Sequence, residues 1–539
     1  MKKIIYILCL LFLTAYNGIY AQTDLPHLER QDNSITLIVN NKPYLIIGGE
    51  LGNSTASDIK YLHPFWEKFI ENHVNTILAP VYWELIEPQE GKYNFDLVDN
   101  LIKEARKSNI KLVLLWFGAW KNSMSCYAPE WVKTNLKRFP RAITSKGEGL
   151  EILSPFSENN LDADIKAFSK LLAHIREIDS KEQTVIMIQV ENEIAMIPEA
   201  RDYCDTANEL YKSEVPGELL KYISENREKL VPEFKNYIEK AGNNKSGSWE
   251  EVFGKSVYTE EIFQAWYYGV FINKLALAGK NEYPLPMYVN AALNREGYLP
   301  GEYPSAGPLP HLMDIWKASA KSLDFLSPDI YFPDFIKYCK LYNRGGNPLF
   351  IPEAEPSFAA AANALYAIGE HEAIGFSPFF IESIDPENHR LGKAYNILKQ
   401  LSPIILKNRG KNKIRGVLLD KDMPVQEIQL GNYSITCSFE LNDKYAAKTI
   451  DENPKAGGII IQLSEDEYII AGSGLIVTFT PIDKEYPIAG FISIDEGKYD
   501  NGKWIPGRRL NGDQNHQGRH MRLSYQDFEI QKVRLYNYK

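Results

Sequence analysis

The sequence predicts a (β/α)8 TIM barrel followed by a C-terminal all-β sandwich domain. Up to about residue 405, short apolar runs alternate with stretches of helical periodicity, a pattern typical of a parallel sheet with helices outside. Several of these runs end in polar or acidic residues, as barrel strands do where they reach an active site. From about Gly410 the helical periodicity disappears and short alternating runs replace it. We therefore expect a barrel domain over residues 22–409 and a β-sandwich over residues 410–539.

Composition limits the classes of partner. The chain has 539 residues, enough for about two to four domains. A formal net charge of −10 argues against a nucleic-acid partner, because neutralising phosphates requires a basic face. Four widely scattered cysteines follow the leader and form no C-x-x-C pair, so neither a zinc site nor a disulfide framework is indicated, although one disulfide stays open: Cys126, Cys204, Cys339 and Cys437.

The amino terminus has the pattern of a secretory signal. Lys2 and Lys3 precede an apolar run over residues 4–15, and Ala21 supplies a small residue before the expected cleavage point. The run is too short to span a bilayer, and no later segment is apolar enough to do so. We expect residues 1–21 to be a signal peptide and the mature chain to be exported, periplasmic or extracellular.

Eight strand candidates precede residue 405, a number that favours a closed barrel over an open sheet. No G-x-G-x-x-G follows the first strand, so a dinucleotide-binding fold is not supported. The charged stretch around 200–257 interrupts the alternation and is interpreted as a helical insertion. The candidates are residues 44–47, 76–79, 111–116, 184–189, 287–292, 325–330, 349–351 and 374–380, and the helices between them are expected over 64–73, 97–107, 165–178, 258–277 and 395–405.

Two of these strands end in carboxylates. The run TVIMIQVENEI, from Thr184 to Ile194, is apolar and then turns acidic, and Glu353 follows the apolar residues 349–351. Glycoside hydrolysis requires such a pair: one group protonates the leaving oxygen while the other attacks or activates water. A neighbouring carboxylate in a partly dry cleft raises the pKa of the acid toward the working pH. The alternative for either strand is an acidic end that simply faces solvent.

Several motifs resemble a known family. The segment from Tyr82 to Pro88, with Gly91, Tyr93 and Phe95, resembles the W-x-x-x-E-P-x-x-G-x-Y-x-F stretch of family 35 β-galactosidases, which are retaining glycoside hydrolases of clan A. Residues 189–193 are similar to that family's Q-V-E-N-E, and residues 348–353 to its P-L-x-x-S-E. The likeness is greatest to a bacterial branch with an appended β domain, whose N-G-D-x-x-H-Q-G-R segment resembles residues 511–519.

The resemblance implies roles for individual residues. Glu193 would be the general acid/base, Glu353 the nucleophile and Asn192 the partner of the sugar 2-hydroxyl. Glu191 would support them, because the family places its proton donor directly after the asparagine. Tyr331 is expected to hydrogen-bond the nucleophile, with a buried structural tyrosine as the alternative.

The sequence also departs from the family pattern. The C-A-E segment that binds galactose is missing after the third strand, where Asn122-Ser123-Met124 stands instead. We expect other residues to line the sugar site in its place, namely Glu50, Tyr82, Trp83, Trp120 and Asn122. Because of this departure, the motifs support the two catalytic residues better than they support any particular sugar.

The sequence thus predicts a secreted retaining β-galactosidase with a carbohydrate substrate. The reaction needs no metal or organic cofactor, and the nine histidines form no H-x-H or H-E-x-x-H cluster. Another clan A exo-β-glycosidase, such as a glucosidase or mannosidase, and a carbohydrate-binding protein without catalysis remain as alternatives. The oligomeric state is left open.

Overall fold

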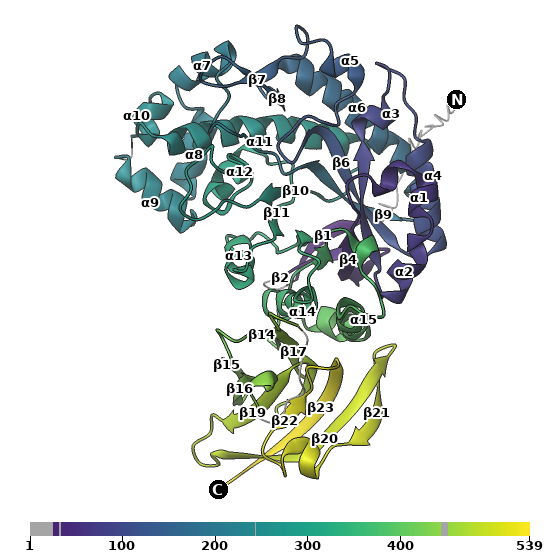
Figure 1. Ribbon diagram of the computed structural model, residues 1–539. Helices are drawn as coiled ribbons and strands as arrows, with labels where there is room; N and C mark the ends of the chain where they lie inside the picture. Colours follow the sequence, from purple (N-terminus) through teal and green to yellow (C-terminus); the bar gives the residue numbers. More distant parts are fainter. Residues whose placement is uncertain (1–24, 32–33, 243, 444–450) are drawn as a thin grey trace, which may run out of the picture.

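A closed barrel of eight parallel strands forms the larger part of the molecule (Figure 1). The computed structural model describes residues 25–31, 34–242, 244–443 and 451–539, so the predicted signal peptide lies outside the described residues. The predicted barrel is confirmed, and each of its eight strands overlaps a predicted one. Its strands are β4 (Ile46–Glu50), β5 (Thr76–Tyr82), β6 (Lys111–Lys121), β9 (Val185–Asn192), β10 (Met287–Ala292), β11 (Phe325–Ile330), β12 (Ile351–Ala354) and β13 (Gly375–Pro378).

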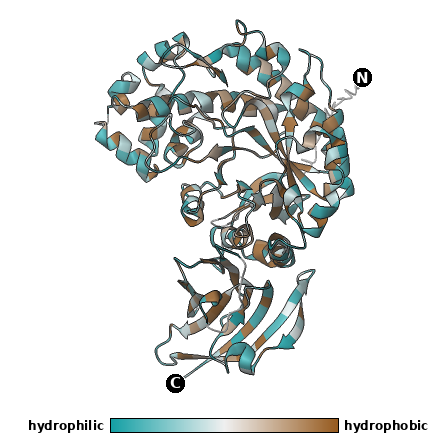
Figure 2. Cartoon of the chain, viewed as in Figure 1, coloured by the Kyte–Doolittle hydropathy of each residue, from teal (hydrophilic) through white to brown (hydrophobic). Residues whose placement is uncertain are grey.

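The barrel strands are buried along almost their whole length because helices cover the outside. Figure 2 shows hydrophobic strands inside and hydrophilic outer helix surfaces. Helix α4 illustrates the pattern, since it buries Val98, Leu101, Ile102 and Ala105 and exposes its charged side. No helix in the described ranges is long and apolar enough to cross a membrane. The covering helices are α2 (Phe65–Glu71), α4 (Asp96–Lys107), α6 (Glu158–Asp179), α11 (Val257–Glu282), α12 (Met313–Ser319), α13 (Phe335–Tyr342), α14 (Ala360–His371) and α15 (Leu391–Asn408).

The start of the barrel differs in detail from the prediction. The expected strand over residues 44–47 is split between two sheets: Tyr44 ends β3 of a small antiparallel sheet, and Ile46 begins barrel strand β4. The Tyr44 hydroxyl donates to the Asn75 carbonyl at 3.0 Å, which ties the small sheet to the residue just before β5. The small sheet contains β1 (His27–Gln31), β2 (Ser34–Val39) and β3 (Lys42–Tyr44).

Residues between β9 and β10 form the predicted helical insertion. Four short helices precede the long helix α11, namely α7 (Asp205–Lys212), α8 (Gly217–Glu225), α9 (Pro232–Lys240) and α10 (Trp249–Phe253). Smaller elements lie on other loops: α1 (Ile59–Leu62), α3 (Trp83–Ile86), α5 (Glu130–Lys133), β7 (Arg141–Ile143) and β8 (Gly149–Leu153).

The C-terminal part is all β, as predicted, and contains two antiparallel sheets. One sheet has the order β14-β17-β18-β23-β20-β21 and the other β15-β16-β19-β22. Six of these strands coincide with short alternating runs in the sequence, whereas β15, β21, β22 and β23 do not, and β21 shows why: its sequence KWIPGRR is polar and mostly exposed. The strands are β14 (Ile414–Leu419), β15 (Val425–Leu430), β16 (Tyr433–Phe439), β17 (Ala456–Gln462), β18 (Glu467–Ser473), β19 (Leu475–Pro481), β20 (Ile488–Asp500), β21 (Lys503–Arg509), β22 (Met521–Leu523) and β23 (Glu529–Tyr538).

The β domain packs closely against helix α14 of the barrel (Figure 1). Small residues permit this approach: a Cβ added at Gly457 would lie 2.6 Å from the Cα of Ala362, and one at Gly369 would lie 3.0 Å from the Cα of Gly416. Arg415 on β14 also forms an ion pair of 2.8 Å with Glu370. Any larger residue at these glycines would push the two domains apart.

Candidate active site

Four buried carboxyl groups meet at the carboxyl ends of the barrel strands. Glu50 ends β4, Glu193 follows β9, Asp329 lies in β11 and Glu353 lies in β12. Glu193, Asp329 and Glu353 each place one oxygen so that all three oxygens lie within 4.8 Å of one another. The structure therefore brings together the two predicted catalytic carboxylates and adds two more acidic groups beside them.

Glu193 is held by contacts from two neighbouring strands. Its backbone N–H donates to Oδ1 of Asn290 at 3.0 Å, and the Asn122 side chain donates to its Oε2. Burial, and then the nearby charge of Glu353, raises the pKa of Glu193 to about 7. A carboxyl group with this pKa is half protonated near neutral pH, as a general acid that must later act as a base requires.

Glu353 has one oxygen held and one oxygen free. The Tyr331 hydroxyl donates to Oε1 of Glu353, whereas Oε2 is buried and has no hydrogen-bond partner. The tyrosine fixes the plane of the carboxylate without occupying the oxygen that would attack. A carboxylate oriented in this way is suited to act as a nucleophile.

Buried amides without partners lie on the strand that leads to Glu193. Both polar atoms of the Asn192 side chain and both of the Gln189 side chain lack a hydrogen-bond partner. Leaving buried polar groups unpaired costs stability, so each such group needs an explanation. A ligand with several hydroxyl groups would supply the missing partners for Asn192 at the end of β9.

Glu50 and Asp329 complete the acidic cluster. No N–H or hydroxyl group of the described residues donates to Glu50, whose carboxyl group lies within hydrogen-bonding reach of Glu353, while Oδ2 of Asp329 accepts from the Asn290 side chain at 2.5 Å. Burial, followed by the charge of Glu353, raises the pKa of both groups well above the usual range. Lys121 at the end of β6 opposes this rise at Glu50. The four carboxyl groups therefore do not all carry a charge at neutral pH.

Glu191 faces away from this cluster and supports the end of β6. Its carboxylate accepts the backbone N–H groups of Gly118 at 3.3 Å, Ala119 at 3.0 Å and Trp120 at 2.7 Å. The left-handed backbone at Glu191 and Glu193, with φ of 62° and 47°, interrupts the strand alternation there. The segment held by Glu191 is the one that leads to Lys121 and Asn122.

The aromatic residues that were expected to line the sugar site are all buried and in contact with other residues. Trp83 and Trp120 are fully buried, and both indole N–H groups donate to other parts of the protein. The Trp83 indole donates to Glu87 at 3.0 Å, and the Trp120 indole donates to the Leu153 carbonyl at 3.2 Å. Tyr82 is also buried, with its ring 5.6 Å from that of Tyr127.

Two residues of the site were missed by the sequence reasoning. Asn290 and Asp329 lie inside strands that are otherwise apolar, MYVNAA and FLSPDI. A polar residue within a buried strand is itself a signal, because it must find a partner in the barrel interior. These two residues are each other's partners.

The three-carboxylate group could hold a divalent cation, since carboxylate oxygens are the ligands that Mg²⁺ and Ca²⁺ prefer. However, all three carboxylates already accept hydrogen bonds from neutral donors, namely Asn122, Asn290 and Tyr331. Such donors suit carboxylates that act without a metal.

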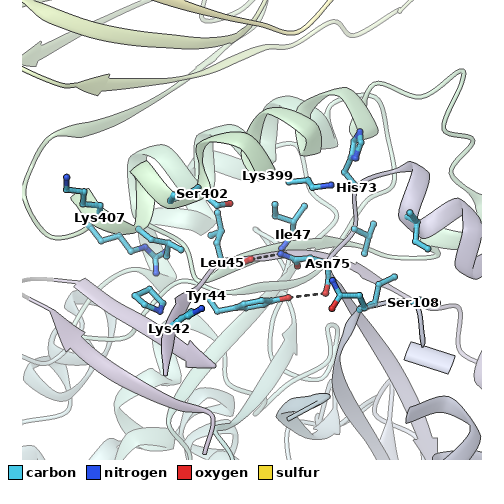
Figure 3. Close-up of a pocket in the computed structure, with 18 of the residues that line it drawn as sticks. Lys42, Tyr44, Leu45, Ile47, His73, Asn75, Ser108, Lys399, Ser402 and Lys407 are labelled. Carbon is cyan, nitrogen blue, oxygen red and sulfur yellow. Dashed lines mark hydrogen bonds between the residues drawn. The ribbon is translucent and has the colours of Figure 1, made fainter. Parts of the chain in front are cut away.

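A cavity of considerable size lies elsewhere, at the amino ends of the barrel strands (Figure 3). It encloses about 1100 Å³ between the residues that precede β4 and β5, such as Leu45 and Asn75, and helix α15, represented by Lys399 and Ser402. In barrels this end serves stability, whereas the chemistry takes place at the carboxyl ends. Cavity size therefore does not identify the site in this molecule.

Two family models match parts of the chain. A model described as beta-galactosidase, that of glycoside hydrolase family 42, matches residues 62–223, which include Asn192 and Glu193. A domain of unknown function (DUF5597) matches residues 391–522, the end of the barrel and most of the β domain. The first match supports a glycoside hydrolase. The predicted resemblance to family 35 is not confirmed, because the model that matches is the one of family 42.

The solved structures that resemble this chain include three β-galactosidases. The enzyme of Bacillus circulans sp. alkalophilus is 17% identical with a TM-score of 0.45, and the alignment covers 67% of this chain and 57% of that one. The enzyme of the psychrophilic Marinomonas ef1 is 11% identical with a TM-score of 0.46, and the alignment covers 68% of this chain and 60% of that one. The enzyme of Rahnella sp. R3 is 16% identical with a TM-score of 0.45, and the alignment covers 67% of this chain and 57% of that one. The chain thus spans less than two thirds of their length. No curated protein sequence matches it.

Proposed function

We propose that this protein is a retaining β-galactosidase that releases terminal β-linked galactose from oligosaccharides or polysaccharides. The carrying observation is the distance between Glu193 and Glu353, whose nearest oxygens lie within 4.8 Å. Retaining enzymes place their two carboxyl groups about 5–5.5 Å apart, whereas inverting enzymes separate them by about 6.5–9.5 Å to admit a water molecule. Two oxygens this close favour direct attack by Glu353 over attack by a water molecule held between the two groups.

In the first step, the free Oε2 of Glu353 attacks the anomeric carbon while Glu193 gives its proton to the glycosidic oxygen. The bond between the anomeric carbon and that oxygen breaks, and the aglycone leaves as an alcohol. The sugar is then held as an ester of Glu353. In the second step, Glu193 takes a proton from water, the oxygen of that water attacks the anomeric carbon, and the ester bond breaks with net retention.

The surrounding residues suit these two steps. The raised pKa of Glu193 favours its protonated form when the free site also holds the charge of Glu353. Once the ester forms, that charge disappears and Glu193 ionises more readily, so it can act as the base. Asn192 has two unpaired polar atoms available for the sugar hydroxyls. A hydrogen bond from Asn192 to the 2-hydroxyl would strengthen in the transition state.

Export belongs to the same proposal. The predicted signal at residues 1–21 would deliver the enzyme to the periplasm or the medium, where glycans are encountered. A fractionation experiment with the full-length chain tests this part independently of the activity. Recovery of the chain only from the cytoplasm, with residues 1–21 still attached, would contradict it.

Hydrolysis of a panel of aryl β-glycosides tests the activity, with Glu353→Gln as the inactive control. We expect the β-galactoside to be cleaved best and NMR to show the β-anomer as the first product. If the enzyme preferred the glucoside or the mannoside, that sugar and not galactose would be its substrate. An α-anomer as first product would exclude the retaining mechanism. Absence of cleavage, with sugar binding intact, would favour the carbohydrate-binding alternative.

A further inference from the structure

Two phenylalanines stand out by their exposure. Among the described residues, Phe358 and Phe380 are the only phenylalanines with exposed side chains, at 40% and 43%. Exposing an apolar ring to water is unfavourable, and scattered exposed residues need no explanation. These two, however, lie on neighbouring loops at one end of the barrel.

Both loops belong to the mouth of the candidate site. Phe358 follows β12, which carries Glu353, and Phe380 follows β13, the next strand of the barrel. Tyr331 follows β11 on the other side of β12 and is also exposed, at 40%, while its hydroxyl donates to Glu353. Three consecutive strands therefore each place an exposed aromatic ring beyond the nucleophile.

Phe380 is exposed and yet firmly held. Its backbone is left-handed, with φ of 54°, a conformation that is unfavourable for a bulky residue. The ring lies on the backbone of Gly52, where an added Cβ would be 2.5 Å from a ring carbon. Gly52 in turn donates to Glu382 at 3.0 Å. A backbone outlier at the mouth of a site indicates a constraint imposed by function.

The strand end before Phe380 is also tied to the nucleophile strand. The N–H of Phe379 donates to the carbonyl of Ala354 at 2.9 Å, and Ala354 directly follows Glu353. The position of the Phe380 ring is thus fixed relative to the attacking carboxylate. A rigid aromatic surface binds a ligand without the entropy loss of ordering a loop.

We propose that Phe380, with Phe358 and Tyr331, forms a subsite for the sugar ring on the leaving-group side of the bond that is cleaved. This inference rests on the proposed function and names its substrate class: a galactoside whose aglycone is another sugar. The groups around the scissile bond, such as Asn192 and Glu50, are fully buried, whereas the three rings lie further out at the same mouth. A pyranose has an apolar face of C–H groups that packs on a flat aromatic ring.

The test compares a substrate with a leaving sugar and one without. β-Galactosyl fluoride has no ring on the leaving-group side, whereas β-galactosyl disaccharides have one. We expect Phe380→Leu to lower kcat/KM for the disaccharides about three- to tenfold, as the loss of one aromatic contact would. The value for the fluoride should stay within about twofold of wild type. Phe380→Trp, which restores a flat ring, should recover the disaccharide activity.

Tyr538→Leu is the matched control, because Tyr538 is 43% exposed on the β domain, the same fraction as Phe380. It should leave both substrates unchanged. Equal losses of Phe380→Leu on both substrates, or no loss on the disaccharides, would overturn the subsite, with thermal unfolding checking that the variant is folded. A wild-type enzyme that does not cleave the fluoride would instead overturn the proposed function, and the subsite with it.

Discussion

The Tyr331 hydroxyl donates to Oε1 of Glu353, and this contact leaves Oε2 buried and without a partner. The two oxygens of one carboxylate therefore have separate tasks: one fixes the orientation of the group and the other is available for attack. Because Tyr331 follows β11 and Glu353 lies in the adjacent strand β12, the contact depends on the register of the barrel.

Tyr331→Phe should reduce the rate of hydrolysis while retaining the fold. A hydrogen bond to a charged group contributes about 1.5–3 kcal/mol, so we expect kcat to fall roughly tenfold to a hundredfold. Steady-state kinetics on an aryl β-galactoside measure the loss. Tyr298→Phe is the control, since Tyr298 is an exposed tyrosine on the loop after β10. Wild-type kcat in Tyr331→Phe would show that the hydroxyl does not orient the nucleophile.

Glu193→Gln should discriminate between leaving groups. Without the acid, kcat/KM for methyl β-galactoside should fall by about 10²–10⁴, whereas a dinitrophenyl galactoside, whose leaving group needs no proton, should change little. The second step still lacks its base, so the glycosyl-enzyme should accumulate and added azide should restore turnover. Equal losses of kcat/KM on both substrates would remove Glu193 from the role of acid.

Asn122→Ala should move the alkaline limb of the pH profile. The acid must be protonated for the first step, so kcat/KM falls as pH rises through the pKa of Glu193, about 7. Asn122 donates to the Glu193 carboxylate and thereby stabilises its charged form. Removing this donor raises the pKa of Glu193, and the limb should shift to higher pH.

Ser123→Ala is the control for that shift. The backbone N–H of Ser123 donates to the carbonyl of Glu193 at 3.1 Å, and this contact survives the substitution. Its profile should match that of the wild type. If the alkaline limb of the kcat/KM profile stayed in place in Asn122→Ala, or moved to lower pH, Asn122 would not stabilise the ionised form of Glu193.

Much of the barrel was predictable because its strands are buried on both faces. Uninterrupted apolar runs such as residues 111–116 mark such strands without reference to any neighbour. The position of the two proposed catalytic carboxylates at the barrel mouth was predictable for a related reason: Glu193 and Glu353 interrupt the apolar pattern where strands end. These signals are local, so the sequence alone carries them.

The direction of individual side chains was not predictable in the same way. Trp120 lies at a strand end beside the site, but the pairing of β6 with β9 shifts between Trp116 and Lys121, and the Trp120 ring packs 5.3 Å from Tyr268 instead. Likewise, the left-handed backbone at Glu191 turns this residue away from Glu193. Such shifts depend on contacts between distant segments, which periodicity does not reveal.

Glu191→Ala should destabilise the protein because three buried N–H groups would lose their acceptor. Each unsatisfied buried group costs about 1–3 kcal/mol, and since such costs are not additive we expect a loss of roughly 2–4 kcal/mol in the free energy of unfolding. Denaturant unfolding measures it. Glu355→Ala, at an exposed position two residues after Glu353, should change stability by less than about 0.5 kcal/mol. Because the segment that Glu191 holds leads to Asn122, the alanine variant should also lose activity on aryl galactosides at temperatures where it is folded. Wild-type stability and activity together would show that the end of β6 needs no such support.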